Sequence, residues 1–93
     1  MLMSLPFLIQ KELCKQLIDG EVEPPLVVQT VLVFGRSAVQ AGWDRHMAVH
    51  LLDTSRALAE LAVVDTPSHR MEMAGIALVA AHWLQNQNGR TIP

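Results

Sequence analysis

The segment that most restricts the fold is residues 67–87, which are apolar around most of a helical circumference. Its apolar side chains belong to Met73, Ile76, Ala77, Ala80, Trp83 and Leu84. Only the side that carries Gly75, His82 and Gln85 is polar or bare. A helix with so little polar surface has to lie between neighbouring elements. We therefore expect a helical domain in which this segment, including Trp83, is buried.

Two other segments predict amphipathic helices. In residues 5–18, Ile9, Leu13 and Leu17 recur every four residues, and charged side chains occupy the opposite side. In residues 44–64, the main apolar stripe consists of Met47, Leu51, Thr54, Leu58 and Leu61. Both stripes are expected to pack in the core of the domain.

The helix predicted for residues 44–64 also carries apolar side chains nearly opposite its main stripe. They are those of Val49, Leu52 and Val63. Because the main stripe packs in the core, this second patch needs a separate cover.

The last predicted helix has recognisable ends. Thr66 and Pro67 fit as its N-cap and first residue, and Asn88 and Gly89 predict its end.

Residues 26–34 are compatible with two structures. Five of these nine residues are β-branched, which favours a strand. The two prolines that precede them also suit the start of a helix, with Val27 and Val31 at helical spacing. We expect an extended segment. A lone strand leaves backbone groups unpaired, so it would pair with residues 37–41, a second subunit or a partner protein.

The composition predicts association with another chain. Of 93 residues, 51% are hydrophobic and only 17% are charged, an apolar balance for so short a domain. A chain of this length buries only about 60–65% of its unfolded surface. The surplus apolar surface favours a homodimer or a complex with another protein. A net charge of −2 without clustered cations argues against nucleic acid as a partner.

The sequence contains no recognised catalytic motif, and we expect a non-enzymatic protein without a cofactor. Cys14 is the only cysteine and lies on the apolar side of the first helix, which predicts a buried thiol. The serines lack a nucleophile-elbow motif. The glycines are isolated along the chain and do not form a phosphate-binding loop.

The remaining features favour a cytoplasmic location. A single cysteine forms no internal disulfide, which suits a reducing compartment. The N-terminal residues lack the basic region of a signal peptide. The longest apolar stretch spans 12 residues, whereas a membrane helix needs about 20, so we expect no membrane segment.

Metal binding is an alternative hypothesis. His46 and His50 are four residues apart and share a helical face with Asp53. The residues between the histidines include no general base of the kind found in metalloprotease motifs. We therefore expect these side chains to lie on a solvated flank of the helix, with His50 against the edge of the core.

Residues 42–84 resemble a known family. The two segments that carry the likeness are residues 44–52, Asp-Arg-His-Met-Ala-Val-His-Leu-Leu, and residues 75–84, Gly-Ile-Ala-Leu-Val-Ala-Ala-His-Trp-Leu. They are similar to the small bacterial anti-activators that bind LuxR-type quorum-sensing regulators and block their dimerisation. The resemblance implies a non-enzymatic dimer that sequesters a transcriptional regulator. It assigns no functional residues, because no motif fixes an alignment.

We therefore expect a single mainly α domain over residues 1–93, with three helices and an extended or helical segment near residues 26–34. The expected function is that of a homodimeric protein-binding regulator of a bacterial protein. An antitoxin or phage-encoded inhibitor, and a metal-binding helical protein, are the alternatives. The expected partner-binding residues are Leu26, Val28, Leu32, Phe34, Trp43, Val49 and Leu52.

Overall fold

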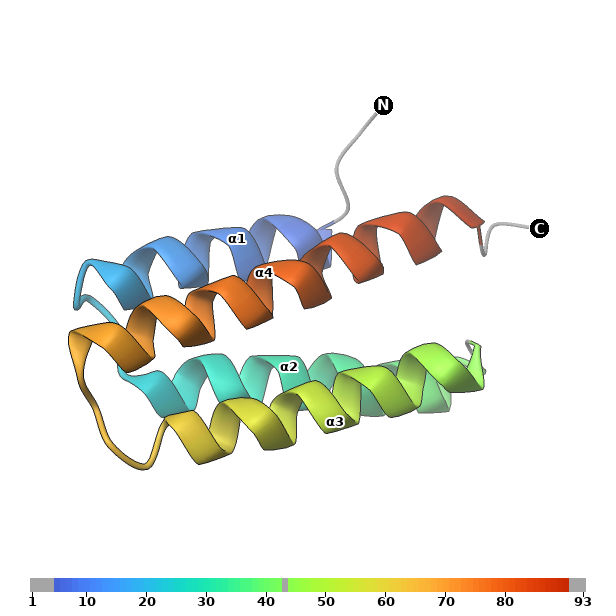
Figure 1. Cartoon of the computed structure of the whole chain (residues 1–93). Coiled ribbons are helices and arrows are strands. Elements are labelled where there is room, and N and C mark those ends of the chain that lie inside the picture. Colours follow the sequence, from blue (N-terminus) through green and yellow to red (C-terminus); the bar gives the residue numbers. More distant parts are fainter. Residues whose placement is uncertain (1–4, 43, 91–93) are drawn as a thin grey trace.

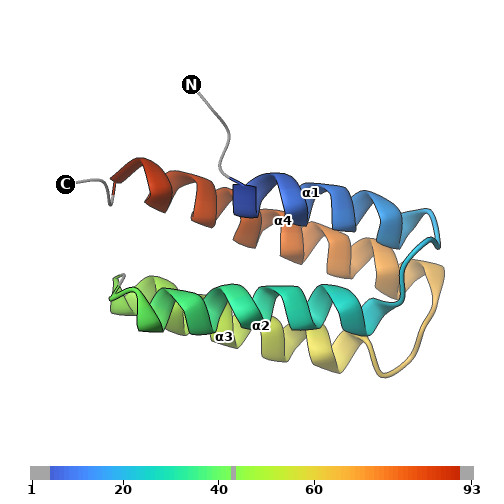
Figure 2. The same cartoon turned by 180° about the vertical axis from the view of Figure 1, so that it is seen from behind.

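The computed structural model describes residues 5–42 and 44–90, without the side chains at positions 6 and 84–90. In this part of the chain, four helices form an up-and-down bundle: α1 (Leu5–Ile18), α2 (Pro24–Gln40), α3 (Arg45–Leu61) and α4 (Pro67–Arg90). α1 lies beside α4, α2 lies beside α3, and the two pairs pack on each other (Figure 1). Seen from behind, the start of α1 and the end of α4 lie at the same end of the bundle (Figure 2).

The expected extended segment at residues 26–34 is wrong, because α2 contains all of it. Pro24 and Pro25 begin the helix, where the N–H groups they lack have no helical partner. Val27 and Val31 are completely buried against the other helices. This burial outweighs the modest strand preference of β-branched residues. The domain therefore has four helices rather than three, and no strand occurs in the residues described.

Side-chain caps fix the starts of α3 and α4. The carboxylate of Asp44 accepts hydrogen bonds from the backbone N–H groups of His46 (2.7 Å) and Met47 (3.4 Å). The hydroxyl of Thr66 accepts one from the backbone N–H of His69 (3.1 Å). Each cap satisfies N–H groups that have no partner within the helix. The predicted N-cap at Thr66 is confirmed.

Two predicted helix ends are wrong by a few residues. α3 ends at Leu61 rather than at residue 64, and the next residues, Val63 and Val64, are exposed and gain no packing from a further turn. α4 continues through Gly89 to Arg90. Glycine permits the left-handed conformation that ends many helices but does not impose it.

The core consists of two clusters along the bundle. The cluster nearer the α1–α2 loop contains Cys14, Leu17, Val27, Val31, Leu58, Met73, Ala74 and Ala77. The second cluster contains Ala38, Met47, Ala48, Leu51 and Ala80. The predicted burial of α4 is confirmed at the positions that belong to these clusters. Trp83 departs from it, because 37% of its surface is exposed.

Arg70 connects the two loops at one end of the bundle. Its guanidinium donates two hydrogen bonds to the carboxylate of Asp65, at 2.6 and 2.7 Å. It also donates to the backbone carbonyls of Leu17 (3.0 Å) and Val22 (2.9 Å). The hydrogen bond from Arg70 holds the pKa of Asp65 below its usual value. These bonds join the end of α1 to the start of α4.

Gln10 is fully buried, and neither polar atom of its amide has a hydrogen-bond partner among the described residues. Burying an unpaired amide costs about 1–3 kcal/mol. We expect Gln10→Met, which keeps a similar volume, to raise the free energy of unfolding by about 1–2 kcal/mol. Urea denaturation followed by circular dichroism measures the change. A lower value for the variant would show that the amide stabilises the folded state.

Candidate functional site

The side of the α2–α3 pair that points away from α1 and α4 carries apolar residues in and between two grooves. We call it the α2–α3 face, and its members are Pro25, Val28, Leu32, Val39, Val49, Leu52, Ala59, Ala62 and Val63. On α2 these residues recur at intervals of three, four and seven, and Val49, Leu52 and Ala59 recur at three and seven on α3, which places each set on one side of its helix. Ala62 and Val63 follow directly after the end of α3. No other helix of the described chain packs on this side.

Gly35 allows α2 and α3 to approach closely in the middle of this face. A Cβ atom added to Gly35 would lie 3.0 Å from Cδ2 of Leu52 and 3.4 Å from Cβ of Leu51. Glycine costs a helix about 0.5–1 kcal/mol relative to alanine. Here the missing side chain provides the space in which Leu52 lies against α2. The close approach also divides the surface into two grooves.

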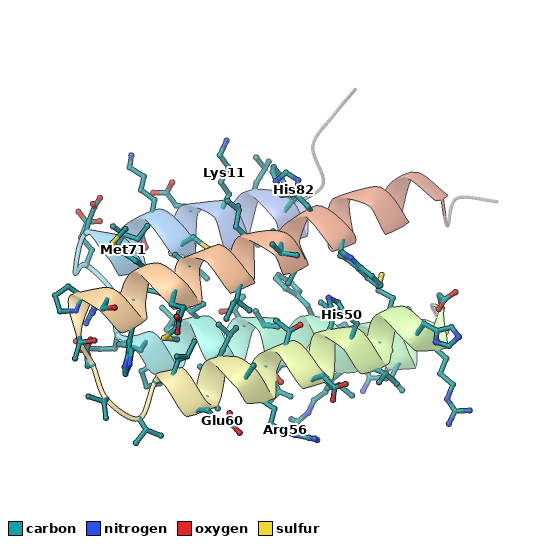
Figure 3. The ribbon with its side chains drawn as sticks, in the orientation of Figure 1. Lys11, His50, Arg56, Glu60, Met71 and His82 are labelled. Carbon is teal, nitrogen blue, oxygen red and sulfur yellow. The ribbon has the colours of Figure 1, made fainter. Side chains whose placement is uncertain are left out.

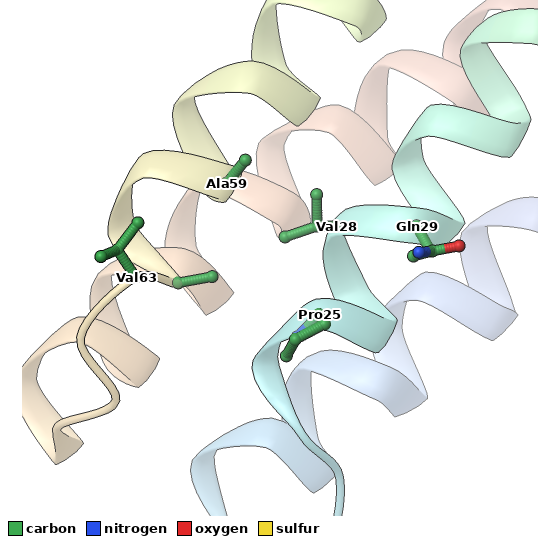
Figure 4. A pocket seen from close by; sticks show the side chains of 6 residues that line it. Pro25, Val28, Gln29, Ala59 and Val63 are labelled. Carbon is green, nitrogen blue, oxygen red and sulfur yellow. The ribbon is translucent and has the colours of Figure 1, made fainter.

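The first groove lies where α2 begins and α3 ends. Its walls are Pro25, Val28 and Gln29 of α2 on one side and Ala59, Ala62 and Val63 on the other (Figure 4). Its volume is about 280 Å³. Val63 exposes 81% of its surface beside this groove. Most of the lining is apolar, which is typical of a surface that binds another molecule.

The second groove lies where α2 ends and α3 begins. It has a volume of about 330 Å³, and its lining residues are Val39, Arg45, Ala48, Val49 and Leu52. Val39 and Val49 expose 58% and 48% of their surfaces. The two grooves therefore have similar sizes and the same apolar character.

Three of the seven expected partner-binding residues line the grooves of the α2–α3 face: Val28, Val49 and Leu52. Leu32, which is partly buried, lies one helical turn after Val28 on the same side of α2. Phe34 instead packs, partly buried, against the second core cluster. Leu26 is exposed, but nine residues separate it from Gly35, which places it on the opposite side of α2 from α3. Trp43 lies outside the described residues.

Several residues of the face were not expected from the sequence. They are Pro25, Val39, Ala59 and Ala62. Val63 was expected in the second apolar patch of its helix but was not among the expected partner-binding residues. The available signal was the spacing of residues 25, 28, 32 and 39, which places apolar side chains on one side of a helix. A strand assignment for residues 26–34 conceals this pattern, because alternate residues of a strand point in opposite directions.

Three exposed arginines accompany the apolar residues of this face. Arg36 follows Leu32 by one helical turn, Arg56 follows Leu52 by one turn, and Arg45 lines the second groove. In Figure 3, Arg56 and Glu60 project from α3 on the side away from the α1–α4 pair. The one ion pair described for these arginines joins Arg56 to Asp53 at 3.9 Å, with both side chains largely exposed. Such pairs are weak, so the positive charge is free to bind an anionic group.

The metal-site hypothesis fails for the described residues. No group of three or more histidine, cysteine or acidic side chains in this part of the chain is arranged to hold a metal ion. His46 is exposed in the first turn of α3. The ring of His50 stacks on Trp83 with the ring centres 4.2 Å apart. This contact links α3 to α4 and turns His50 towards the space between the two helix pairs, as Figure 3 shows.

Cys14 has the buried position expected from the sequence. Only 5% of its surface is exposed, and it belongs to the first core cluster. Burial raises the pKa of its thiol to about 11, because the interior disfavours the charged thiolate. The thiol is therefore protonated at neutral pH and is a poor nucleophile.

The helices of the described residues are too short or too polar to cross a membrane. The chain matches no protein-family model, no curated protein and no solved structure.

Proposed function

We propose that this chain is a non-enzymatic protein-binding regulator, which holds another protein on its α2–α3 face and thereby sequesters or inhibits it. The observation that carries the proposal is the exposure of Val39, Val49 and Val63 beside two apolar grooves. Covering apolar surface contributes about 25 cal/mol per Å². Covering this face therefore stabilises the complex with the partner, and no catalytic or metal-binding group is needed.

The proposed partner is a bacterial transcriptional regulator. The support is the resemblance of residues 42–84 to anti-activators of LuxR-type regulators. This stretch includes all of α3, which contributes Val49, Leu52 and Ala59 to the α2–α3 face. The chain would inhibit such a regulator by occupying a surface that the regulator needs for its own assembly.

Homodimerisation is also part of the proposal. Leu8 and Ile9 follow Leu5 by three and four residues, so each shares a side of α1 with Leu5, and all three are exposed. Ile9 therefore departs from the core position expected for its stripe. These three residues are remote from the α2–α3 face. A second copy that packs on this part of α1 would leave the face open to the partner.

A comparison of matched valine variants tests the proposal. Val39→Glu/Val63→Glu places one carboxylate beside each groove, at positions exposed enough to leave the fold intact. Val79→Glu changes a valine of similar exposure (56%) on α4. Each tagged protein is incubated with lysate of the source organism, and bound proteins are quantified by mass spectrometry. We expect a partner that binds the wild type and Val79→Glu but is lost from the double variant.

Circular dichroism and sedimentation velocity serve as controls for this comparison. The double variant should have the helix content of the wild type and the same sedimentation coefficient, because neither the core nor α1 is altered. Equal recovery of every bound protein by the wild type and the double variant would contradict the proposed function, as would the absence of any enriched protein.

A further inference from the structure

We propose that the segment bound by the α2–α3 face is a single amphipathic helix, with acidic residues on both flanks and two apolar anchors eleven residues apart. This inference rests on the proposed function and specifies the chemistry of the partner. It follows from the spacing of the two grooves and from the charges beside them.

The spacing of the grooves matches the repeat of an α-helix. Val28 in the first groove and Val39 in the second are eleven residues apart on α2, and Val63 and Leu52 have the same separation on the α3 side. Eleven residues make about three helical turns and span about 16 Å. Residues eleven apart on a bound helix also point in nearly the same direction. A helix that lies along α2 and α3 thus places one anchor in each groove.

The middle of the face suits the same ligand. Leu32 lies between Val28 and Val39 along α2, and Gly35 keeps α2 close to Leu51 and Leu52 of α3. The two grooves lie on either side of this close approach. A bound helix would place smaller apolar residues at the centre, four and seven residues after the first anchor. This is the pattern of helices that bind in apolar grooves of other proteins.

The charges predict acidic flanks on the bound helix. Arg36 lies on the α2 side of the face, whereas Arg45 and Arg56 lie on the α3 side. Asp53 and Glu60 follow Val49 by four and eleven residues, so they lie with Val49 at the outer edge of the face, farther from α2 than Arg45 and Arg56. An occupant between the two helices therefore meets arginines on both sides. Guanidinium groups bind carboxylates with paired hydrogen bonds, so glutamate or aspartate is favoured at these positions.

The same charges disfavour a second copy of the chain as the occupant. In a two-fold symmetric dimer, the same surface patch is present on both partners. Pairing the α2–α3 face with itself would bring together two surfaces that each carry three arginines, Arg36, Arg45 and Arg56, and only two carboxylates at the edge. Like charges that face each other across an interface weaken it. A separate acidic helix satisfies both the apolar grooves and the arginines.

A displayed peptide library tests this inference on the folded full-length chain. The library consists of helices of about 18 residues, long enough for both anchors. Anchor positions vary among large and small apolar residues, and flank positions vary among glutamate, glutamine and lysine. We expect selection at about 50 mM salt, where charge attraction is little screened, to enrich glutamate at the flanks and large apolar residues at positions i and i+11.

A synthetic peptide of the enriched sequence then gives the affinity by fluorescence anisotropy. Its dissociation constant should rise at least about tenfold for Val39→Glu/Val63→Glu and for Arg36→Ala/Arg56→Ala, and it should stay unchanged for Val79→Glu. Enrichment of lysine at the flanks, a different anchor spacing or the absence of any binder would overturn the inference. A wild-type dimer that the double valine variant dissociates would also overturn it, because a second copy would then occupy the face.

This test separates the inference from the proposed function. If no acidic helix binds but a cellular protein is still lost from the double valine variant, the face binds a partner of another shape. If an acidic helix binds but no cellular protein depends on the face, the proposed function fails instead.

Discussion

Replacing Leu58 with alanine is expected to lower the free energy of unfolding by about 2–5 kcal/mol. Leu58 is completely buried in the first core cluster, between residues of α1, α2 and α4. The substitution removes apolar contacts and leaves a cavity that the rigid helices fill only in part. Urea denaturation followed by circular dichroism measures the loss. In so short a chain, it removes a large share of the total stability.

Leu52→Ala is the matched control for this prediction, because it makes the same change six residues earlier in α3. Leu52 is only partly buried and lies on the α2–α3 face. We expect this variant to lose about 1 kcal/mol, within the usual range for partly exposed positions. Equal losses at the two positions would contradict the assignment of Leu52 to a surface that is open in the free protein.

Cys14 is expected to react with a disulfide reagent at least about 100-fold more slowly in the folded chain than in the urea-unfolded chain at pH 8. Burial raises the pKa of this thiol from 9.0 to about 11. The thiolate is the reactive form, so a pKa higher by two units lowers its population about 100-fold. Burial of the sulfur atom slows the reaction further. Absorbance of the released thiol reports both rates.

The raised pKa of Cys14 also predicts how stability depends on pH. The folded state holds the thiol proton more tightly than the unfolded state. The contribution of the neutral Cys14 thiol to the free energy of unfolding is therefore fully present below pH 9, and it is lost as the pH rises through 11. A Cys14→Ala variant provides the control for the pH dependence, since it lacks the ionisable group.

In the experiment with the disulfide reagent, rapid labelling of Cys14 in the folded wild type would contradict the buried position of the thiol.

Much of the fold was predictable from residues that are close together in the sequence. The four-residue repeat of Ile9, Leu13 and Leu17 predicts α1, and the cap at Thr66 predicts the start of α4. α2 was not predictable in this way. Its valines favour a strand locally, and only their burial against α1, α3 and α4 makes the helix the stable structure.

The candidate site was predictable only in part, for a similar reason. Val49 and Leu52 stand out because they lie opposite the main stripe of their own helix. The two grooves depend on how α2 and α3 pair, and that pairing depends on the close approach at Gly35. A single glycine within an apolar stretch gives no sign in the sequence of which helix will lie against it.

The central claim is that the α2–α3 face is open in the free chain and is covered by an acidic helix in the complex. Methyl NMR spectra, recorded as the selected acidic peptide is added, test it most directly. We expect the methyl signals of Val28, Leu32, Val39, Val49, Leu52 and Val63 to shift in proportion to binding. The signals of Val33 and Val79, which are exposed on other surfaces to about the same extent as Val39, should stay in place. Shifts confined to α1 and α4, with the α2–α3 face unchanged, would contradict the claim.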